Sequence, residues 1–419
     1  MSFIETTLKV ILLFFVLVGI HEWGHFYFAK RAGILVREFA IGFGPKLFSY
    51  RRGETKYTVR LMPIGGFVRM AGEDPEIVTI QQGQTIAIRL NQQREVSALI
   101  LDQLDQRTEV IQGTVEQIDI EQQLTLEMLV HEERMQYRIH PQAMMITKSQ
   151  ETQIAPKNRQ FSHKSVSQRM LTIVMGPVMN FILAIGLFAI LITMIGVPTN
   201  VKLEQVEANK AGATAGLQAG DIILSIDQVP ITDQRQTLTS LIQQSPDTKM
   251  TWVIERNGQT FNVEVTPNNE DGKGRVGIAI TGDTRSASFT EVVTGTYKQL
   301  INSTQNILTG FKMLILGQFK LDDLGGPVRT AQVTAEFARM GLHYLIFWAG
   351  TLSLYLGLFN LLPFPALDGG RLVFLGFEAV RGKPIDPSRE SIVHFVGFAV
   401  LMLLMLAVTY NDILRFINS

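Results

Sequence analysis

The chain contains no cysteine, and its 38 basic residues are balanced by 38 acidic ones. Without cysteine it can form no disulfide bond, and no thiolate can act as a nucleophile or as a metal ligand. A formal net charge of zero gives no indication of a nucleic-acid partner. Charged residues make up only 18% of the 419 residues, hydrophobic residues make up 46%, and the two kinds are segregated along the chain. A chain of this length exceeds one ordinary domain.

Four long segments are nearly free of charge and predict membrane spans. A run of about 20 mostly apolar residues matches the hydrocarbon core of a bilayer. Buried helices of a large soluble enzyme are the alternative, but the length of the runs and their lack of charge favour spans. The first run lacks the small-residue cleavage site of a signal peptide, so we expect it to be retained. The runs cover residues 7–28, 170–197, 344–365 and 392–410.

Basic residues predict how these spans are oriented. The stretch after the first span carries nine basic residues against Glu38 and Glu54, and positive charge beside a span marks the cytoplasmic side. The loop between the last two spans is also basic, so we expect it on the same side. Both termini and the 198–340 block should then be extracytoplasmic, and the 30–165 segment cytoplasmic. The basic residues are Lys30, Arg31, Arg37, Lys46, Arg51, Arg52, Lys56, Arg60 and Arg69, with Arg381, Lys383 and Arg389 in the later loop.

The segments between the spans predict separate domains. Two period-two runs, Val36–Ile41 and Tyr57–Leu61, each lead into a turn rich in glycine and proline, and they predict a membrane-associated β-hairpin sheet. A later pair of strands flanks Asn257-Gly258, a strong hairpin signal inside a compact α+β domain. The expected order is a first span in 1–34, the hairpin in 35–72, a small mixed cytoplasmic insertion in 73–165, a second span in 166–197, the α+β domain in 198–285, amphipathic helices in 286–343 and two spans in 344–419.

His21 and His25 predict a metal site inside the first span. A spacing of four residues places both imidazoles on one face of a helix. Glu22 beside them completes the His-Glu-x-x-His pattern, in which two histidines bind zinc and the carboxylate takes a proton from water. A polar patch that binds another helix is the alternative. Such residues are costly in a membrane unless they have partners and a function, which favours the metal site.

A catalytic zinc ion usually has three protein ligands, and Asp368 is the best candidate for the third. It follows the third apolar run, after two prolines and before Gly369-Gly370, and the predicted topology places it on the same membrane side as His21. An aspartate that caps the next helix is an equally good explanation of this residue by itself. Gly176 to Asn180, at the start of the second span, could line a cavity or simply allow close helix packing.

These motifs together resemble the site-2 proteases, the intramembrane zinc metalloproteases of the bacterial RseP/RasP type. The resemblance covers nearly the whole chain. It rests on His21 to His25, on the Asn360 to Gly370 segment, on the Gly176 to Asn180 motif and on the hairpin that ends in Pro63 to Met70. The 198–285 block, with Gly216-Leu217-Gln218-Ala219-Gly220-Asp221, is similar to the PDZ domain of this family.

The resemblance implies a function and a set of site residues. His21, His25 and Asp368 would bind Zn²⁺, and Glu22 would activate water. Substrate would be contacted by Asn360, Asn180 and the hairpin residues Gly65, Gly66 and Phe67. The implied activity is regulated intramembrane proteolysis in the cytoplasmic membrane of a bacterium. Its substrates would be transmembrane proteins such as anti-sigma factors or remnant signal peptides, already shortened by another protease.

Three other classes of protein fit the sequence less well. A di-iron membrane oxidase needs several histidine boxes, and the sequence has one spaced pair. A metal transporter would need polar residues in several spans, whereas these spans are otherwise apolar. A non-catalytic membrane PDZ adaptor would bind peptide tails beside an idle metal site, and the intact Glu22 argues against it. The sequence thus predicts a polytopic α-helical membrane protein with four transmembrane helices, a β-hairpin sheet and an inserted PDZ-like α+β domain.

Overall fold

The computed structural model describes residues 3–73, 80–104, 109–148, 151–231, 235–318 and 325–418. The chain forms two compact units. The first contains Met1–Gly186 together with Ser303–Ser419, and the second contains Leu187–Asn302. The helices α2 (Val166–Ile195) and α5 (Phe289–Ile315) each have residues in both units.

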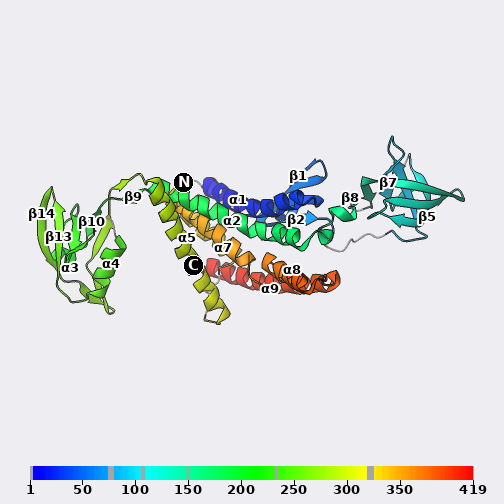
Figure 1. The fold of residues 1–419 in the computed structure, drawn as a ribbon. Coiled ribbons are helices and arrows are strands. Elements are labelled where there is room, and N and C mark those ends of the chain that lie inside the picture. Colours follow the sequence, from blue (N-terminus) through cyan, green and yellow to red (C-terminus); the bar gives the residue numbers. More distant parts are fainter. Residues whose placement is uncertain are drawn as a thin grey trace. The chain divides into compact units, whose positions relative to one another are not determined.

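Four helices of the described residues are long and apolar enough to cross a membrane. They are α1 (Phe3–Arg31), α2, α7 (Leu342–Asn360) and α9 (Pro387–Asn418). Each contains most of one predicted apolar run, and α1, α2 and α9 extend beyond their runs into polar residues. Figure 1 shows α1, α2 and α7 side by side. Glycines allow this contact, since a β-carbon on Gly24 would lie 2.3 Å from the Met175 carbonyl oxygen and one on Gly357 would lie 2.7 Å from the Phe181 ring.

A helix that was not expected follows α7. The region between the last two spans was expected to be a loop, but Asp368–Arg381 forms helix α8. It ends at Gly382, whose φ of 66° is the left-handed conformation that terminates many helices. An amphipathic helix, α6 (Pro327–Met340), precedes α7.

The predicted hairpin forms one compact sheet from two long strands, β1 (Val36–Arg52) and β2 (Thr55–Met70). Residues 36–41 pair on one side with 56–59 and on the other with 66–70, while residues 46–52 pair with 55–60. Both strands therefore bend at the predicted turns. Gly42, with φ 92°, and Gly65, with φ 80°, supply the conformation that these bends require. The bends leave residues 66–70 along one edge of the sheet.

The 73–165 insertion differs from the predicted mixed domain. Its described residues contain strands and short 3₁₀ turns, without an α-helix. The strands pair in the order β4-β3-β5-β6-β7-β8, and an additional parallel pairing of β4 with β7 closes five of them into a barrel. Alternating apolar residues fill its centre, among them Ile86, Leu99 and Met128, each fully buried. The strands are β3 (Thr85–Leu90), β4 (Val96–Ile100), β5 (Ile111–Asp119), β6 (Thr125–Val130), β7 (Glu133–Ile146) and β8 (Glu151–Gln153), followed by 3₁₀ turns η2 (Lys157–Arg159) and η3 (Phe161–His163).

The second unit is a small α+β domain. Its main sheet has the order β14-β13-β11-β10-β17, and its core surrounds the fully buried Trp252. The turn at Asn257-Gly258 has positive φ at both residues, 50° and 79°, as its sequence predicts. Its elements are β9 (Val197–Pro198), β10 (Val201–Val206), α3 (Ala211–Thr214), β11 (Ile222–Ile226), β12 (Val229–Pro230), α4 (Arg235–Gln244), β13 (Met250–Arg256), β14 (Gln259–Val265), β15 (Asn268–Glu270), β16 (Lys273–Arg275), β17 (Ile278–Thr281) and β18 (Thr284–Arg285).

Candidate metal centre and active site

The two histidines of α1 lie one helical turn apart and face the same point. Their Nε2 atoms are 3.3 Å apart, and both residues are buried, each 7% exposed. The flanking helix is apolar and continuous, so the ring positions follow from the four-residue spacing alone. The predicted pairing of His21 with His25 is therefore present in the fold.

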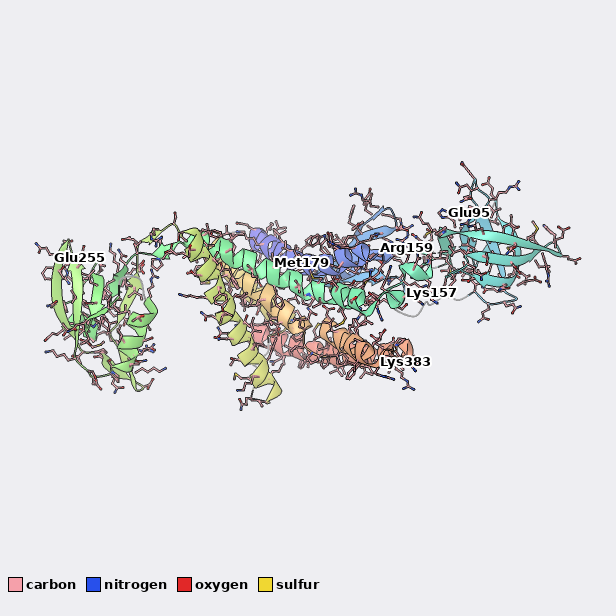
Figure 2. The ribbon with its side chains drawn as sticks, in the orientation of Figure 1. Glu95, Lys157, Arg159, Met179, Glu255 and Lys383 are labelled. Atoms are coloured by element: carbon pink, nitrogen blue, oxygen red, sulfur yellow. The ribbon has the colours of Figure 1, made fainter. Side chains whose placement is uncertain are left out.

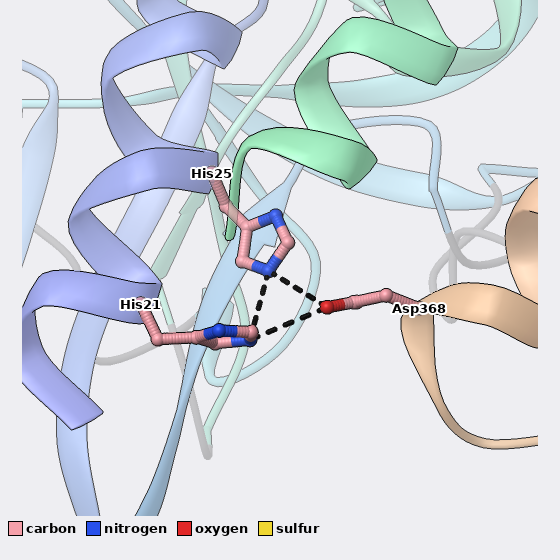
Figure 3. Close-up of side chains that lie close together, drawn as sticks. All are labelled: His21, His25 and Asp368. Carbon is pink, nitrogen blue, oxygen red and sulfur yellow. Dashed lines mark hydrogen bonds and ion pairs between the residues drawn. The ribbon is translucent and has the colours of Figure 1, made fainter. Parts of the chain in front are cut away.

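Asp368 of α8 completes this cluster (Figure 3). Its Oδ2 atom lies 3.3 Å from His21 Nε2 and 3.4 Å from His25 Nε2. The ligand atoms of the three residues all lie within 4.8 Å of one another. Leu367, rather than Asp368, is the N-cap of α8, and no side-chain capping bond forms there. The structure thus does not use Asp368 as the helix cap that was the alternative explanation.

The chemistry of these three residues fits a zinc ion. Asp368 Oδ2 is buried and has no hydrogen-bond partner among the described residues, which is costly for a carboxylate unless a cation is bound. Two imidazole nitrogens and one carboxylate oxygen are a common ligand set of catalytic zinc sites, which keep a fourth position open for water. The His25 imidazole is also held on the side away from the cluster, because its Nδ1 atom lies 2.9 Å from the Thr172 carbonyl oxygen. That contact requires a hydrogen on Nδ1 and leaves the Nε2 lone pair for a metal.

Helix α2 lies directly against the histidines at the Gly176 to Asn180 motif. A β-carbon on Gly176 would lie 2.2 Å from His25 Nε2, so only glycine fits there. Asn180, which was expected to contact substrate, lies against a histidine of the cluster. It is fully buried, and its Nδ2 lies 3.2 Å from His21 Nδ1. The motif was expected either to line a cavity or to allow close helix packing. The close packing of α2 at Gly176 places the motif directly against the histidines.

Glu22 lies beside the cluster and against the hairpin sheet. It is 8% exposed, and a β-carbon on Gly66 would lie 2.8 Å from its Cγ. The edge segment 66–70 therefore passes next to the proposed base. Gly65 lies at the bend before this edge, packed on Phe43, and the Phe67 ring has the guanidinium of Arg60 5.2 Å from its centroid.

Asn360 ends helix α7, a few residues before Asp368. Its Nδ2 donates to the Leu356 carbonyl oxygen at 2.9 Å, which leaves its second amide hydrogen and its oxygen for other partners. Two further residues that were not predicted shape the site, namely Gly24 and Thr172. Gly24 lies inside the histidine motif and could have been suspected as a helix contact. Thr172 acts through its backbone carbonyl, which no sequence pattern reveals.

Comparison with known proteins identifies the family of this chain. The model of "Peptidase family M50" matches residues 9–404. The chain belongs to peptidase family M50. Among M50 relatives, "Zinc metalloprotease RasP" of Oceanobacillus iheyensis is 43% identical over 98% of this chain and 99% of its own. "Zinc metalloprotease RasP" of Geobacillus kaustophilus is 42% identical over 99% of both chains, and "Regulator of sigma-W protease RasP" of Bacillus subtilis is 41% identical over 99% of both.

Membership of the M50 family confirms the site-2 protease resemblance and the predicted enzyme class. The chain is a metalloendopeptidase, and the names of its relatives confirm zinc as the cofactor. Together with the four long apolar helices, the family also makes it a membrane protein.

Proposed function

We propose that this chain hydrolyses peptide bonds in or near transmembrane segments of single-span membrane proteins, with zinc held by His21, His25 and Asp368. The observation that carries the proposal is the meeting of these three side chains, from two separate helices, at a buried point of an apolar bundle. Ionisable residues in such a place are costly and are retained for function. Glu22 lies beside them and is also buried.

Each residue then has a distinct part in the chemistry. Bound zinc would supply a Lewis acid that lowers the pKa of water and polarises the scissile carbonyl. Glu22 accepts a proton from the attacking water and delivers it to the leaving amine nitrogen, so the carboxylate is regenerated. Asn360 donates its second amide hydrogen to the oxyanion that develops on the carbonyl oxygen. Asn180, being buried, orients His21 from behind.

The hairpin sheet is proposed to hold the substrate. A peptide bond inside a helix is shielded by the helix backbone, so the segment must be unwound before attack. Residues 66–70 form an edge of the sheet next to Glu22, and an extended peptide can pair with such an edge through its backbone. Gly65, Gly66 and Phe67 would then lie along the bound strand.

The topology and the second unit extend the proposal. The basic residues after α1 and around Arg381 support an active site that opens toward the cytoplasm of a bacterial cell, with both termini outside.

The α+β domain of 198–285 would be an extracytoplasmic PDZ-like filter for substrates pre-cleaved by another protease. Its cavity of ≈ 290 Å³ between α4 and the edge strand β17, lined by Leu238, Ile242, Ile278 and Ile280 among others, has room for a peptide tail. One relative is named for the regulator of sigma-W, which agrees with anti-sigma factors as substrates.

Co-expression with a tagged single-span membrane protein tests this function. Glu22→Gln keeps the shape of the side chain and removes the base, so it should retain zinc and yield no product. A shortened product seen only with the native chain supports the proposal. Equal cleavage by Glu22→Gln would refute the mechanism. An intact substrate that nevertheless co-purifies with both forms would favour the non-catalytic PDZ adaptor.

A further inference from the structure

The turn that carries Asp368 has an unusual backbone conformation. Ala366, two residues before Asp368, has a φ of 76°, a left-handed conformation that residues other than glycine rarely adopt. A conformation of this kind persists only where neighbouring groups hold it. The Ala366 N–H donates to Nδ1 of His394 in α9, at 2.9 Å. A side chain 28 residues further along the chain thus holds the strained position.

A second residue of α9 presses on the same turn. A β-carbon on Gly397 would lie 2.4 Å from Pro365 Cβ and 2.6 Å from its carbonyl oxygen. Gly397 lies three residues after His394, on the same face of the helix. Residues of one helical turn of α9 therefore contact Pro365 and Ala366 together. Helix α9 therefore packs directly against this turn.

The chemical form of His394 follows from its surroundings. Accepting from a backbone N–H requires a lone pair on Nδ1, so the neutral ring carries its hydrogen on Nε2. Nε2 is buried and has no hydrogen-bond partner among the described residues, and the Glu390 Oε1 atom is 3.7 Å away. The ring also packs on Phe374 of α8, with centroids 5.4 Å apart. The hydrogen bond that this imidazole makes is therefore the one that it accepts from the Ala366 N–H.

We propose that His394 is a positioning residue for the metal ligand Asp368. By accepting from Ala366 it holds the left-handed turn, and the turn directs the Asp368 carboxylate at His21 and His25. The inference rests on the proposed function, since it takes Asp368 as a zinc ligand. It adds α9, the last apolar helix, to the elements on which the metal site depends.

Three variants of the full-length chain, purified in detergent, test the inference through zinc affinity. Competition with a chromophoric chelator measures this affinity without any substrate. His394→Asn places Oδ1 as many bonds from the backbone as Nδ1, so the acceptor is kept and affinity should stay within about threefold of native. His394→Leu keeps bulk and loses the acceptor, and affinity should fall about 10-fold or more. Adding Ala366→Gly to His394→Leu should recover most of that loss, because glycine adopts positive φ without support.

Several results would overturn the inference. One is native zinc affinity in His394→Leu, and another is equal weakening in His394→Asn and His394→Leu, which would show that ring packing matters instead of the acceptor. Failure of Ala366→Gly to restore any affinity would also contradict it. Asp368→Asn, measured in parallel, separates this inference from the proposed function. If Asp368→Asn binds zinc normally, the proposed site itself is wrong. If only Asp368→Asn weakens binding, the site stands and His394 does not position it.

Discussion

Gly176 of α2 lies against the imidazole of His25 so closely that a β-carbon at this position would be 2.2 Å from Nε2. The same β-carbon would lie 3.0 Å from His21 Cε1. We predict that Gly176→Ala displaces both rings and lowers zinc affinity and cleavage by about 100-fold, the usual order of effect for a displacement near 1 Å in an active site. Metal content after dialysis against a chelator is the direct measurement.

Gly186 provides a matched control for this substitution. It lies in the same helix, and a β-carbon there would meet nothing within 4 Å among the described residues. Gly186→Ala should therefore keep zinc and activity. Equal loss in both variants would show that α2 itself is intolerant of alanine, and native zinc content in Gly176→Ala would contradict the geometry of the site.

The contact of Asn180 with His21 leads to a second prediction. His21 needs a hydrogen on Nδ1 if Nε2 is to bind metal. The Asn180 amide, whose Nδ2 faces Nδ1 in the structure, must therefore turn over to present its oxygen when zinc is bound. Asn180→Asp keeps an oxygen acceptor and should retain zinc affinity. Asn180→Leu is similar in size without an acceptor and should weaken zinc binding about 10-fold or more. A role in substrate contact alone would instead leave zinc affinity native in both variants and change only the KM for cleavage.

Gly66 gives a prediction that separates the base from the metal ligands. A β-carbon there would lie 2.8 Å from Glu22 Cγ and 2.7 Å from the Ala40 carbonyl oxygen, while the three proposed ligands are not among its nearest atoms. Gly66→Ala should therefore keep zinc and lower the cleavage rate about 10-fold or more. Gly310→Ala, where the described structure leaves open space, is the control. Loss of zinc from Gly66→Ala would mean that the hairpin supports the metal site as well.

Apart from Asp368, which was assigned by the predicted topology and the family resemblance, the predicted parts of the site are those that depend on local spacing. His21 and His25 meet because a helix brings residues four apart onto one face. The bends of the hairpin follow from its glycines and prolines in the same local way. In contrast, Asn180 reaches His21 across 159 residues and His394 reaches Ala366 across 28, and no spacing rule connects such pairs.

The missed helix α8 shows a different limit. Its first turn contains Gly369 and Gly370 after two prolines, a pattern typical of a loop. In the structure these glycines serve a close contact, since β-carbons on them would lie 2.2 Å from the Leu362 carbonyl oxygen and 2.4 Å from that of Phe364. The turn before α8 packs against the first residues of this helix, and only glycine leaves room for its carbonyl oxygens. The barrel of the insertion was missed for a related reason, because its closure depends on the non-local pairing of β4 with β7.

Glu54, in the turn between β1 and β2, makes the hairpin sensitive to acid. Arg159 Nη2 donates to its Oε2 at 2.7 Å, and Gln153 Nε2 donates to its Oε1 at 2.8 Å (Arg159 is labelled in Figure 2). The hydrogen bonds from Arg159 hold the pKa of Glu54 at about 2, below its ordinary value of 4.5. Because the pKa is lowered by folding, the carboxylate stabilises the fold above pH 4.5, and this contribution is lost as the pH falls toward 2. Hydrogen-exchange protection of residues 55–60 in the native chain should thus drop about 10-fold between pH 6 and pH 3. Glu54→Gln should be less protected already at pH 6 and change little on acidification, and the same pH dependence in both proteins would assign the acid sensitivity to another group.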